Sequence, residues 1–251
     1  MDAAASPLPF LSVVIPVYNE GASFRRLLEA VVAAATFPFE VLVVYDFEED
    51  DTLPVVRELA GKFSRLRAVK NRFGSGALNA LRTGFAEARG DGVVVLMGDG
   101  SDDVSVLPRM YQHFCAGSDL ICGSRYSPGG QQIGGPVLKK WLSRVAGISL
   151  HYLSGLPTRD ATNSFKMYRA SLLRSLPIES RAGFEVSLEL CVKAFLAGYR
   201  ISEVPCVWRE RTAGRSRFRL LGWIPHYLRW YLYALWHRWF GRRPRRAGAR
   251  E

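Results

Sequence analysis

Short apolar runs alternate with amphipathic segments over the first hundred residues of the chain. The apolar runs are rich in Val, Ile and Leu and contain few polar residues, which predicts strands buried on both faces, as in a parallel sheet. In the segments between them apolar residues recur every three or four positions, which predicts helices. The predicted strands are 11–16, 39–45, 66–69 and a strand beginning at 92, and the predicted helices are 24–35, 52–63 and 77–88. This order predicts an α/β fold, a mostly parallel sheet with helices on both faces.

The pattern is less regular after Pro108. A stretch rich in Gly and Pro, 127–136, predicts a loop. The remaining predictions are strands at 119–123 and 199–208, an extended segment at 160–168, and helices at 138–153 and 184–196. Neither an internal repeat nor a clear linker interrupts the chain, so we expect one domain over 1–220 and a distinct tail over 221–251.

We expect the chain to be organised around Gly92 to Asp103, where a buried strand runs directly into glycines and acids. Asp99, Asp102 and Asp103 follow this strand, at the carboxyl end where open α/β sheets bind ligands. Carboxylates are hard oxygen donors that suit Mg²⁺ or Mn²⁺, and these ions suit phosphate oxygens. A solvated acidic turn that caps the next helix is the alternative for Asp102 and Asp103.

Three other predicted strands also end in polar residues or glycines. Glu20 and Asp46 follow the first and second strands, where carboxylates can accept hydrogen bonds from a base or a ribose. Gly74 and Gly76 follow the third strand and precede a helix, an arrangement that can cradle a phosphate. Structural alternatives remain open: Asp46 as a local cap, Glu20 as a first-turn acid, and the glycines as a turn.

The charge of the chain is concentrated at its C-terminal end. The formal net charge is +11, and the segment from Arg209 onward holds twelve arginines, no lysine and two glutamates. The rest of the chain is therefore close to neutral, which argues against a general nucleic-acid-binding fold. It favours an anionic surface as the partner of the C-terminus.

The segment 222–240 is rich in aromatic residues, and one polar stripe runs along it. His226, Arg229, Tyr233 and His237 are spaced three or four residues apart, as on one side of a helix. The short span and a central arginine argue against a transmembrane helix. A basic, aromatic amphipathic helix indicates a segment lying at a membrane surface, with the arginine pairs 242–243 and 245–246 near anionic headgroups. Packing on its own domain or on a second subunit is the alternative.

The four cysteines indicate neither disulfides nor a zinc site. Cys115, Cys122, Cys191 and Cys206 show no Cys-x-x-Cys spacing and lie mostly in apolar runs. We expect buried thiols in a reducing compartment. No secretory signal is visible at the N-terminus, so a cytoplasmic location is expected.

Taken in order, these strand-end residues resemble family-two glycosyltransferases of the GT-A, Rossmann-like fold. The matching elements are Pro16-Val-Tyr18-Asn-Glu20, Asp46 with Asp50, Gly74-x-Gly76-x-x-Asn79 and Gly98-Asp99. Segments 123–126, 160–169, 203–205 and 211–218 are similar to the branch that transfers mannose or glucose to polyprenyl or dolichyl phosphate. The resemblance covers residues 10–220. Two positions depart from it, because Met97 and Tyr45 each stand where the family has an aspartate.

The resemblance implies a site for a nucleotide-sugar donor and a Mg²⁺ or Mn²⁺ ion. With Met97 in place of an acid, Asp99 is the expected metal ligand, assisted by Asp102. The implied donor-binding residues are Pro16, Tyr18, Glu20, Asp46, Gly74, Gly76, Asn79 and Asp99.

A lipid phosphate acceptor needs cations but no general base, since its second pKa near 6 leaves it mostly dianionic at neutral pH. The candidate cations are Arg125, Arg144, Arg211 and Arg217, because arginine binds phosphate bidentately. Asp99, Arg125, Arg211 and Arg217 are the expected catalytic residues. A sugar hydroxyl as acceptor would instead require a carboxylate base, for which Glu185 and Glu189 are the candidates. We expect Asp160 to order its loop rather than react.

Together these features predict a metal-dependent, inverting glycosyltransferase. It would move a hexose from a nucleotide diphosphate sugar to a polyprenyl phosphate, peripherally bound at the cytoplasmic face of a membrane through 222–251. Two rivals remain: a transferase acting on a soluble sugar or polysaccharide, and a non-catalytic nucleotide-sugar-binding membrane scaffold. The sequence identifies neither the sugar, the nucleotide, the acceptor lipid nor the oligomeric state.

Overall fold

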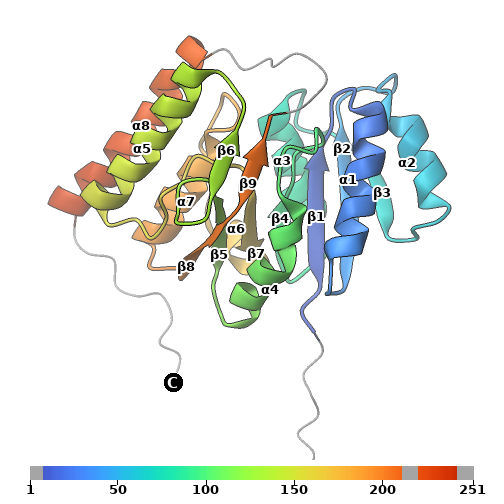
Figure 1. Cartoon of the computed structure of the whole chain (residues 1–251), viewed down its shortest axis with the longest axis horizontal. Coiled ribbons are helices and arrows are strands. Elements are labelled where there is room, and N and C mark those ends of the chain that lie inside the picture. The colour runs from blue at the N-terminus through green and yellow to red at the C-terminus, as the bar shows by residue number, and fades with distance from the viewer. Residues whose placement is uncertain (1–7, 211–219, 242–251) are drawn as a thin grey trace, which may run out of the picture.

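A seven-stranded, mostly parallel sheet with helices on both faces forms the body of the protein (Figure 1). The computed structural model describes residues 8–210 and 220–241. The strand order is β3-β2-β1-β4-β7-β5-β8, and β6 and β9 form a separate two-stranded sheet. The strands are β1 (Leu11–Pro16), β2 (Phe39–Tyr45), β3 (Leu66–Lys70), β4 (Gly92–Val95), β5 (Leu120–Ser124), β6 (Gln131–Ile133), β7 (Lys166–Arg169), β8 (Ile201–Pro205) and β9 (Val207–Arg209). The α/β fold class predicted from the alternating pattern is confirmed.

Six helices, α1, α2, α3, α5, α7 and α8, lie where the sequence predicted them, with ends that differ by a few residues, whereas α4 and α6 were not predicted. A short 3₁₀ helix, Val104–Val106, precedes α4. The helices are α1 (Gly21–Ala34), α2 (Thr52–Ala60), α3 (Ala77–Glu87), α4 (Leu107–Cys115), α5 (Val137–Ser154), α6 (Ala170–Ser175), α7 (Val186–Leu196) and α8 (Leu220–Phe240).

Alternate residues of the central strands point to two separate hydrophobic cores. Val13 and Ile15 of β1 pack with α1, α2 and α4, whereas Val14 between them packs with α3 and the helices of the C-terminal half. Because side chains alternate across a strand, a strand covered on both faces needs apolar residues at every position. Residues 11 to 15 of β1 and 39 to 44 of β2 are accordingly all buried, and the two polar residues among them, Ser12 and Glu40, are joined by a hydrogen bond from the Ser12 hydroxyl at 2.7 Å.

The second half of the sheet differs from the sequence prediction in two places. The predicted strand 199–208 is divided at Cys206 into β8, which pairs with β5, and β9, which pairs with β6. Pro205 has no backbone N–H to continue the ladder, and the Cys206 N–H instead bonds to the Ser124 carbonyl at 2.9 Å. The stretch 127–136, predicted to be a loop, contains β6.

The segment 160–168 is a strand only in its last part, β7, which is antiparallel to both β4 and β5. The residues before it form side-chain-stabilised turns instead. The Thr158 hydroxyl accepts a bond from the Asp160 N–H at 3.1 Å, and Asn163 Nδ2 donates to the Gly123 carbonyl at 2.9 Å. Local bonds of this kind compete with a sheet ladder, which apolar periodicity does not reveal.

Helix α8 is docked on α5 and α7 rather than separate from the domain (Figure 1). Trp230 and Ala234 are buried in the core that also contains Leu150 of α5 and Val192 of α7. The Tyr231 hydroxyl donates to Ser149 on α5 at 2.9 Å. Of the alternatives considered for this segment, packing on its own domain is therefore present in the structure.

The opposite side of α8 exposes large apolar side chains, as does the neighbouring face of α5. Exposed apolar residues at three- and four-residue spacing are Ile224, Leu228, Leu232, Trp236 and Trp239 on α8, and Leu138, Trp141, Val145 and Tyr152 on α5. The polar stripe predicted at His226, Arg229, Tyr233 and His237 separates this face from the buried one. Within residues 8–210 and 220–241, no helix is both long and apolar enough to cross a membrane.

The docking of α8 predicts that the helix contributes to the stability of the whole domain. Trp230→Ala should lower the free energy of unfolding by about 3–5 kcal/mol, because truncating a buried Trp removes its packing and leaves a cavity. Urea unfolding followed by circular dichroism measures this. Trp236→Ala on the exposed side of the same helix is the matched control and should cost less than about 1 kcal/mol. Equal effects of the two substitutions would contradict the docking.

Candidate active site

Strands β3, β2, β1 and β4 are consecutive neighbours and run parallel, so their carboxyl ends lie at one edge of the sheet. The predicted donor-binding residues follow these four strand ends. The structure therefore brings together Pro16, Tyr18 and Glu20 after β1, Asp46 after β2, Gly74, Gly76 and Asn79 after β3, and Asp99 after β4. Glu20, Asp46 and Asp99 are each partly exposed, so none is sealed away from a ligand.

The loops after β1 and β2 are fastened to each other by side chains of the second loop. Asp50 is buried, and its two carboxylate oxygens accept from the Asn19 N–H at 3.1 Å and the Thr52 N–H at 2.9 Å. The Thr52 hydroxyl accepts from the Glu20 N–H at 3.0 Å, and Asp51 accepts from the Gly21 N–H at 2.9 Å. These bonds fix the backbone on which Glu20 and Tyr18 stand.

Asp46 connects the end of β2 to the glycine loop. One of its oxygens accepts from the Gly76 N–H at 2.9 Å and the other from Asn71 Nδ2 at 2.8 Å. Gly74 and Gly76 have φ angles of 95° and 108°, a region that favours glycine. The carboxylate thus holds the loop at the start of α3, and its predicted role toward the donor stays a prediction.

The loop after β4 lies against the loop after β1. A Cβ on Gly98 would lie 3.0 Å from the Pro16 carbonyl oxygen and 3.2 Å from Glu20 Cγ. The absence of a side chain at residue 98 therefore permits the close approach of the two loops. It brings the backbone of Asp99 next to Glu20.

Asp99 and Asp102 differ in their surroundings. Asp99 is half-buried, and its Oδ1 accepts from the Ser101 N–H at 3.0 Å. Asp102 is buried, and its Oδ2 accepts from the Met97 N–H at 2.9 Å. Burial, together with the nearby Asp99 charge, raises the pKa of Asp102 from 3.8 to about 7. Asp102 thus closes the loop around Asp99, and its predicted role as a metal ligand stays a prediction.

The acids of this loop fit a divalent ion only in combination with a substrate. Residues 8–210 and 220–241 contain no group of three His, Cys, Asp or Glu side chains positioned to hold a metal. Mg²⁺ commonly takes one or two carboxylates and completes its coordination with substrate phosphates and water. Asp99, with one oxygen outside the Ser101 bond, matches that pattern.

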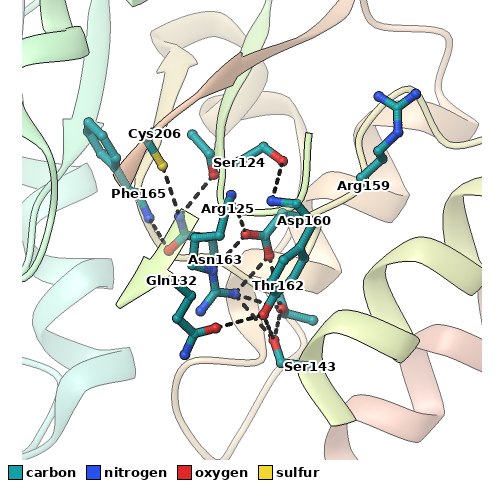
Figure 2. Close-up of polar contacts among 12 residues, drawn as sticks. Ser124, Arg125, Gln132, Ser143, Arg159, Asp160, Thr162, Asn163, Phe165 and Cys206 are labelled. Atoms are coloured by element: carbon teal, nitrogen blue, oxygen red, sulfur yellow. Dashed lines mark hydrogen bonds and ion pairs between the residues drawn. The ribbon is translucent and has the colours of Figure 1, made fainter. Parts of the chain in front are cut away.

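Arg125 is held by an ion pair with Asp160 (Figure 2). Its Nε donates to Asp160 Oδ2 at 2.7 Å and its Nη2 to Asp160 Oδ1 at 2.8 Å. Nη2 also contacts the hydroxyls of Ser143 at 3.2 Å and Thr162 at 3.4 Å. Because Asp160 also accepts from the Arg125 N–H at 3.0 Å, it orders this loop, as expected from the sequence. The pair raises the pKa of Arg125 against the opposing effect of burial.

Helix α5 is fitted closely to the loop that carries Asp160. A Cβ on Gly147 would lie 2.3 Å from the Arg159 carbonyl oxygen, so the helix backbone rests directly on that loop. One turn earlier, Ser143 of α5 contacts Arg125 and the Tyr126 hydroxyl, which donates to it at 2.9 Å. The loop, the Arg125–Asp160 pair and α5 therefore form one packed unit.

The other candidate phosphate ligands have different positions. Arg144 follows Ser143 on α5 and is exposed. Arg211 and Arg217 lie outside the described residues, as does the whole segment 211–218 that carries the resemblance there.

The two glutamates considered as alternative bases hold a loop. Glu189 is fully buried and accepts from the backbone N–H groups of Glu179 at 2.6 Å and Ser180 at 2.8 Å, and it pairs with Lys193 at 2.7 Å. Glu185 Oε1 accepts from the Ala182 N–H at 2.8 Å, while its Oε2 is buried with no partner among the described residues. Of these two glutamates, Glu185 is thus the one with an uncommitted oxygen.

Asp50 and Thr52 shape the candidate site in a way that the sequence reasoning did not assign. They build the site indirectly, by joining two loops some thirty residues apart. The only available signal was the position of Asp50 in the family resemblance. The cysteines agree with expectation except Cys115, which is exposed, whereas Cys122, Cys191 and Cys206 are buried free thiols.

The raised pKa of Asp102 predicts a pH dependence of stability. Between about pH 4 and 7 the folded protein keeps a proton on Asp102 that the unfolded chain releases, so stability should fall as the pH rises through this window. The loss of unfolding free energy, on the order of 2–4 kcal/mol, should be absent in Asp102→Asn, whose side-chain oxygen can still accept from the Met97 N–H. Urea unfolding of the metal-free protein from pH 4 to 8 measures it. The exposed Asp51→Asn is the control and should retain the wild-type slope.

Curated relatives match most of this chain. A polyprenol monophosphomannose synthase of Mycolicibacterium smegmatis is 30% identical over 86% of this chain and 83% of its own. An undecaprenyl-phosphate mannosyltransferase of Micrococcus luteus is 30% identical over 89% of this chain and 94% of its own. A dolichol-phosphate mannosyltransferase of Pyrococcus furiosus is 28% identical over 83% of this chain, which spans only 59% of that protein.

The structural and family comparisons agree with these relatives. A solved structure of glucosyl-3-phosphoglycerate synthase from Mycobacterium tuberculosis, bound to Mn²⁺, UDP and phosphoglyceric acid, superposes with a TM-score of 0.61 at 21% identity. It covers 92% of this chain and 78% of its own, and at this identity it supports the fold alone. The model of glycosyl transferase family 2 matches residues 12–176. With more than half of its length matched, the chain belongs to glycosyl transferase family 2.

Proposed function

We propose that this protein transfers a hexose, with inversion, from a nucleotide diphosphate sugar to a polyprenyl phosphate at a membrane surface. The observation that carries the proposal is the presence of two features in one domain. One is a row of strand-end acids and glycines typical of donor binding, in a member of glycosyl transferase family 2. The other is the exposed apolar face of α5 and α8. Relatives named for transfer to polyprenyl, undecaprenyl and dolichol phosphates support the choice of acceptor.

In the proposed site the donor lies along the carboxyl ends of β3, β2, β1 and β4. Glu20 and Asp46 accept hydrogen bonds from the nucleoside, with Pro16 and Tyr18 beside it, and Gly74, Gly76 and Asn79 line the diphosphate. Asp99 would hold a Mg²⁺ or Mn²⁺ ion shared with the diphosphate, and such an ion stabilises charge on a departing nucleoside diphosphate. The bonds from Asp50, Thr52 and Asp46 to neighbouring loops preorganise these groups before the donor arrives.

The acceptor needs no general base. An oxygen of the lipid phosphate attacks the anomeric carbon from the side opposite the leaving diphosphate. The bond between the anomeric carbon and the diphosphate oxygen breaks, and its electron pair leaves with the nucleoside diphosphate. The attacking group is already a dianion, so its main requirement is cations that offset repulsion from the donor. We assign this task to Arg144, Arg211, Arg217 and Arg125. Since Arg125 donates to Asp160, Ser143 and Thr162, its guanidinium has a single orientation, while the Asp160 carboxylate balances its charge.

The membrane side of the proposal rests on the exposed apolar faces of α5 and α8. Monomeric soluble proteins seldom expose contiguous apolar surface on two adjacent helices. The basic residues Lys139, Lys140 and Arg144 lie on other faces of α5 than the apolar stripe, and basic side chains that flank an apolar face suit an anionic bilayer surface. A location at the cytoplasmic face, with the basic segment after α8 at the headgroups, completes the proposal.

The rival acting on a soluble sugar acceptor now depends on one residue. Glu189 is occupied by two backbone N–H groups and Lys193, whereas Glu185 keeps one oxygen without a partner among the described residues. Deletion of 222–251 does not separate the two hypotheses, because the segment is not an independent tail. It would remove Trp230 and Ala234 from the hydrophobic core under either hypothesis.

Incubation with labelled donor tests the proposed activity directly. Purified protein, Mg²⁺ and polyprenyl phosphate in vesicles should convert one of GDP-mannose or UDP-glucose into labelled lipid and release the nucleoside diphosphate. Asp99→Ala should lower turnover at least about 100-fold, because it removes the carboxylate assigned to the ion. Glu49→Gln, at an exposed position of the loop after β2, controls for general damage to the site.

Three outcomes would contradict parts of this proposal. Transfer to a soluble sugar but not to lipid would favour the Glu185 rival. Donor binding by calorimetry without any turnover would favour the scaffold. Full activity of Asp99→Ala would move the metal elsewhere.

The apolar face predicts a defect that depends on the form of the acceptor. Replacing Trp141 and Trp236 together by Ser should reduce vesicle binding, and transfer to vesicle-borne lipid, by about 10- to 100-fold, since each side chain removes apolar area from the interface. Transfer to a short-chain polyprenyl phosphate in detergent should change less than about threefold. Val32→Ser, at an exposed apolar position of α1, is the control. Equal loss with both acceptors would contradict a membrane role for this face.

A further inference from the structure

A pocket lies between the loop that precedes α7 and the side of α8, apart from the strand ends described above. Its volume is about 160 Å³. Since a water molecule occupies about 30 Å³ of liquid, the pocket has room for one small organic group. It is lined by Ser180, Arg181, Glu185, His226, Arg229 and Trp230.

The loop that forms one wall of this pocket is held by hydrogen bonds to its backbone. Glu185 and Glu189 of α7 accept four successive backbone N–H groups, those of residues 179 to 182, at 2.6, 2.8, 3.2 and 2.8 Å. A carboxylate that accepts from backbone amides fixes the chain it holds. The wall therefore exists before any ligand arrives.

Two buried polar atoms of the wall have no hydrogen-bond partner within residues 8–210 and 220–241. They are Glu185 Oε2 and Ser180 Oγ, on residues that are 1% and 2% exposed. An unsatisfied buried carboxylate oxygen costs free energy, which a donor entering the pocket would recover. A hydroxyl group suits both atoms, because it can donate to the carboxylate and exchange bonds with the serine.

The outer part of the pocket is basic. Arg181, His226 and Arg229 are exposed there. Arg229 pairs with Glu179 at 3.1 Å, but both side chains are half exposed, and a surface pair of this kind is weak enough to exchange for a phosphate. An anion without a hydroxyl group would be repelled by the Glu185 carboxylate, and a neutral polyol would form no ion pair with the arginines.

We propose that this pocket binds a polyol phosphate, with a hydroxyl at Glu185 and Ser180 and the phosphate at Arg181 and Arg229. The chemistry is shared by free glycerol phosphate and by the headgroup of a phospholipid such as phosphatidylglycerol. Ile224 and Leu228 of the exposed apolar face stand on the same helix turns as His226 and Arg229, so either source can reach the pocket. The inference goes beyond the proposed transfer reaction and does not require it.

Calorimetric titration of the full chain with three small ligands tests the proposal. Glycerol 3-phosphate should bind at least about tenfold more tightly than ethyl phosphate, which lacks the hydroxyls, and than glycerol, which lacks the phosphate. In Glu185→Gln the preference for glycerol phosphate over ethyl phosphate should fall below about threefold, because the amide nitrogen cannot accept. Arg181→Gln should weaken both phosphates alike. Arg174→Gln, on exposed α6, is the matched control and should change neither.

Vesicles distinguish the two sources of the same chemistry. Phosphatidylcholine vesicles containing phosphatidylglycerol are compared with vesicles containing phosphatidylmethanol, which carries the same charge without hydroxyls. Preference for phosphatidylglycerol that Glu185→Gln abolishes identifies a headgroup, and preference only in the soluble titration identifies a free metabolite. Ser180→Ala repeats the test should Glu185→Gln unfold. The proposal is overturned if neither arm favours the hydroxylated phosphate, or if both variants keep the full preference.

Discussion

The parallel pairing of β1 with β2 on one side and β4 on the other is the constraint on which the candidate site depends. It places the ends of three strands side by side, so that Glu20, Asp46 and Asp99 share one edge although they are far apart in the sequence. Such pairing needs strands buried on both faces, and hence two cores. The site is thus a consequence of the way this sheet is covered.

Carboxylates at this edge serve the structure first. Asp50 joins the loops after β1 and β2, Asp46 holds the glycine loop, and Asp102 closes the turn around Asp99. Each lies next to a residue or backbone segment assigned to the donor. Under the proposed function, the same type of group provides both the frame and the binding surface, and a substitution in the frame alters the site without touching a ligand.

The sequence was sufficient for the parallel half of the fold, because a predominantly apolar run as short as 39–44 is typical of a strand buried on both faces. It was insufficient where polar side chains decide the backbone. Pro205 divides a predicted strand, and Thr158, Asp160 and Asn163 replace a predicted extension with turns. In the site, the strand-end acids were predictable from position. The ion pair of Arg125 with Asp160 joins residues far apart in the sequence, and the backbone amides bound by Glu189 belong to the loop that precedes α7. Neither contact is encoded by a periodicity.

Gly147 gives the contact between α5 and the Asp160 loop a further significance. Because the helix backbone rests on the Arg159 carbonyl, α5 is held at a fixed distance from the Arg125–Asp160 pair. Under the proposed function, the outer side of α5 touches lipid while its inner side touches the reaction centre. The helix then acts as a spacer of fixed thickness, and the depth at which a lipid phosphate is presented is set by the diameter of one helix.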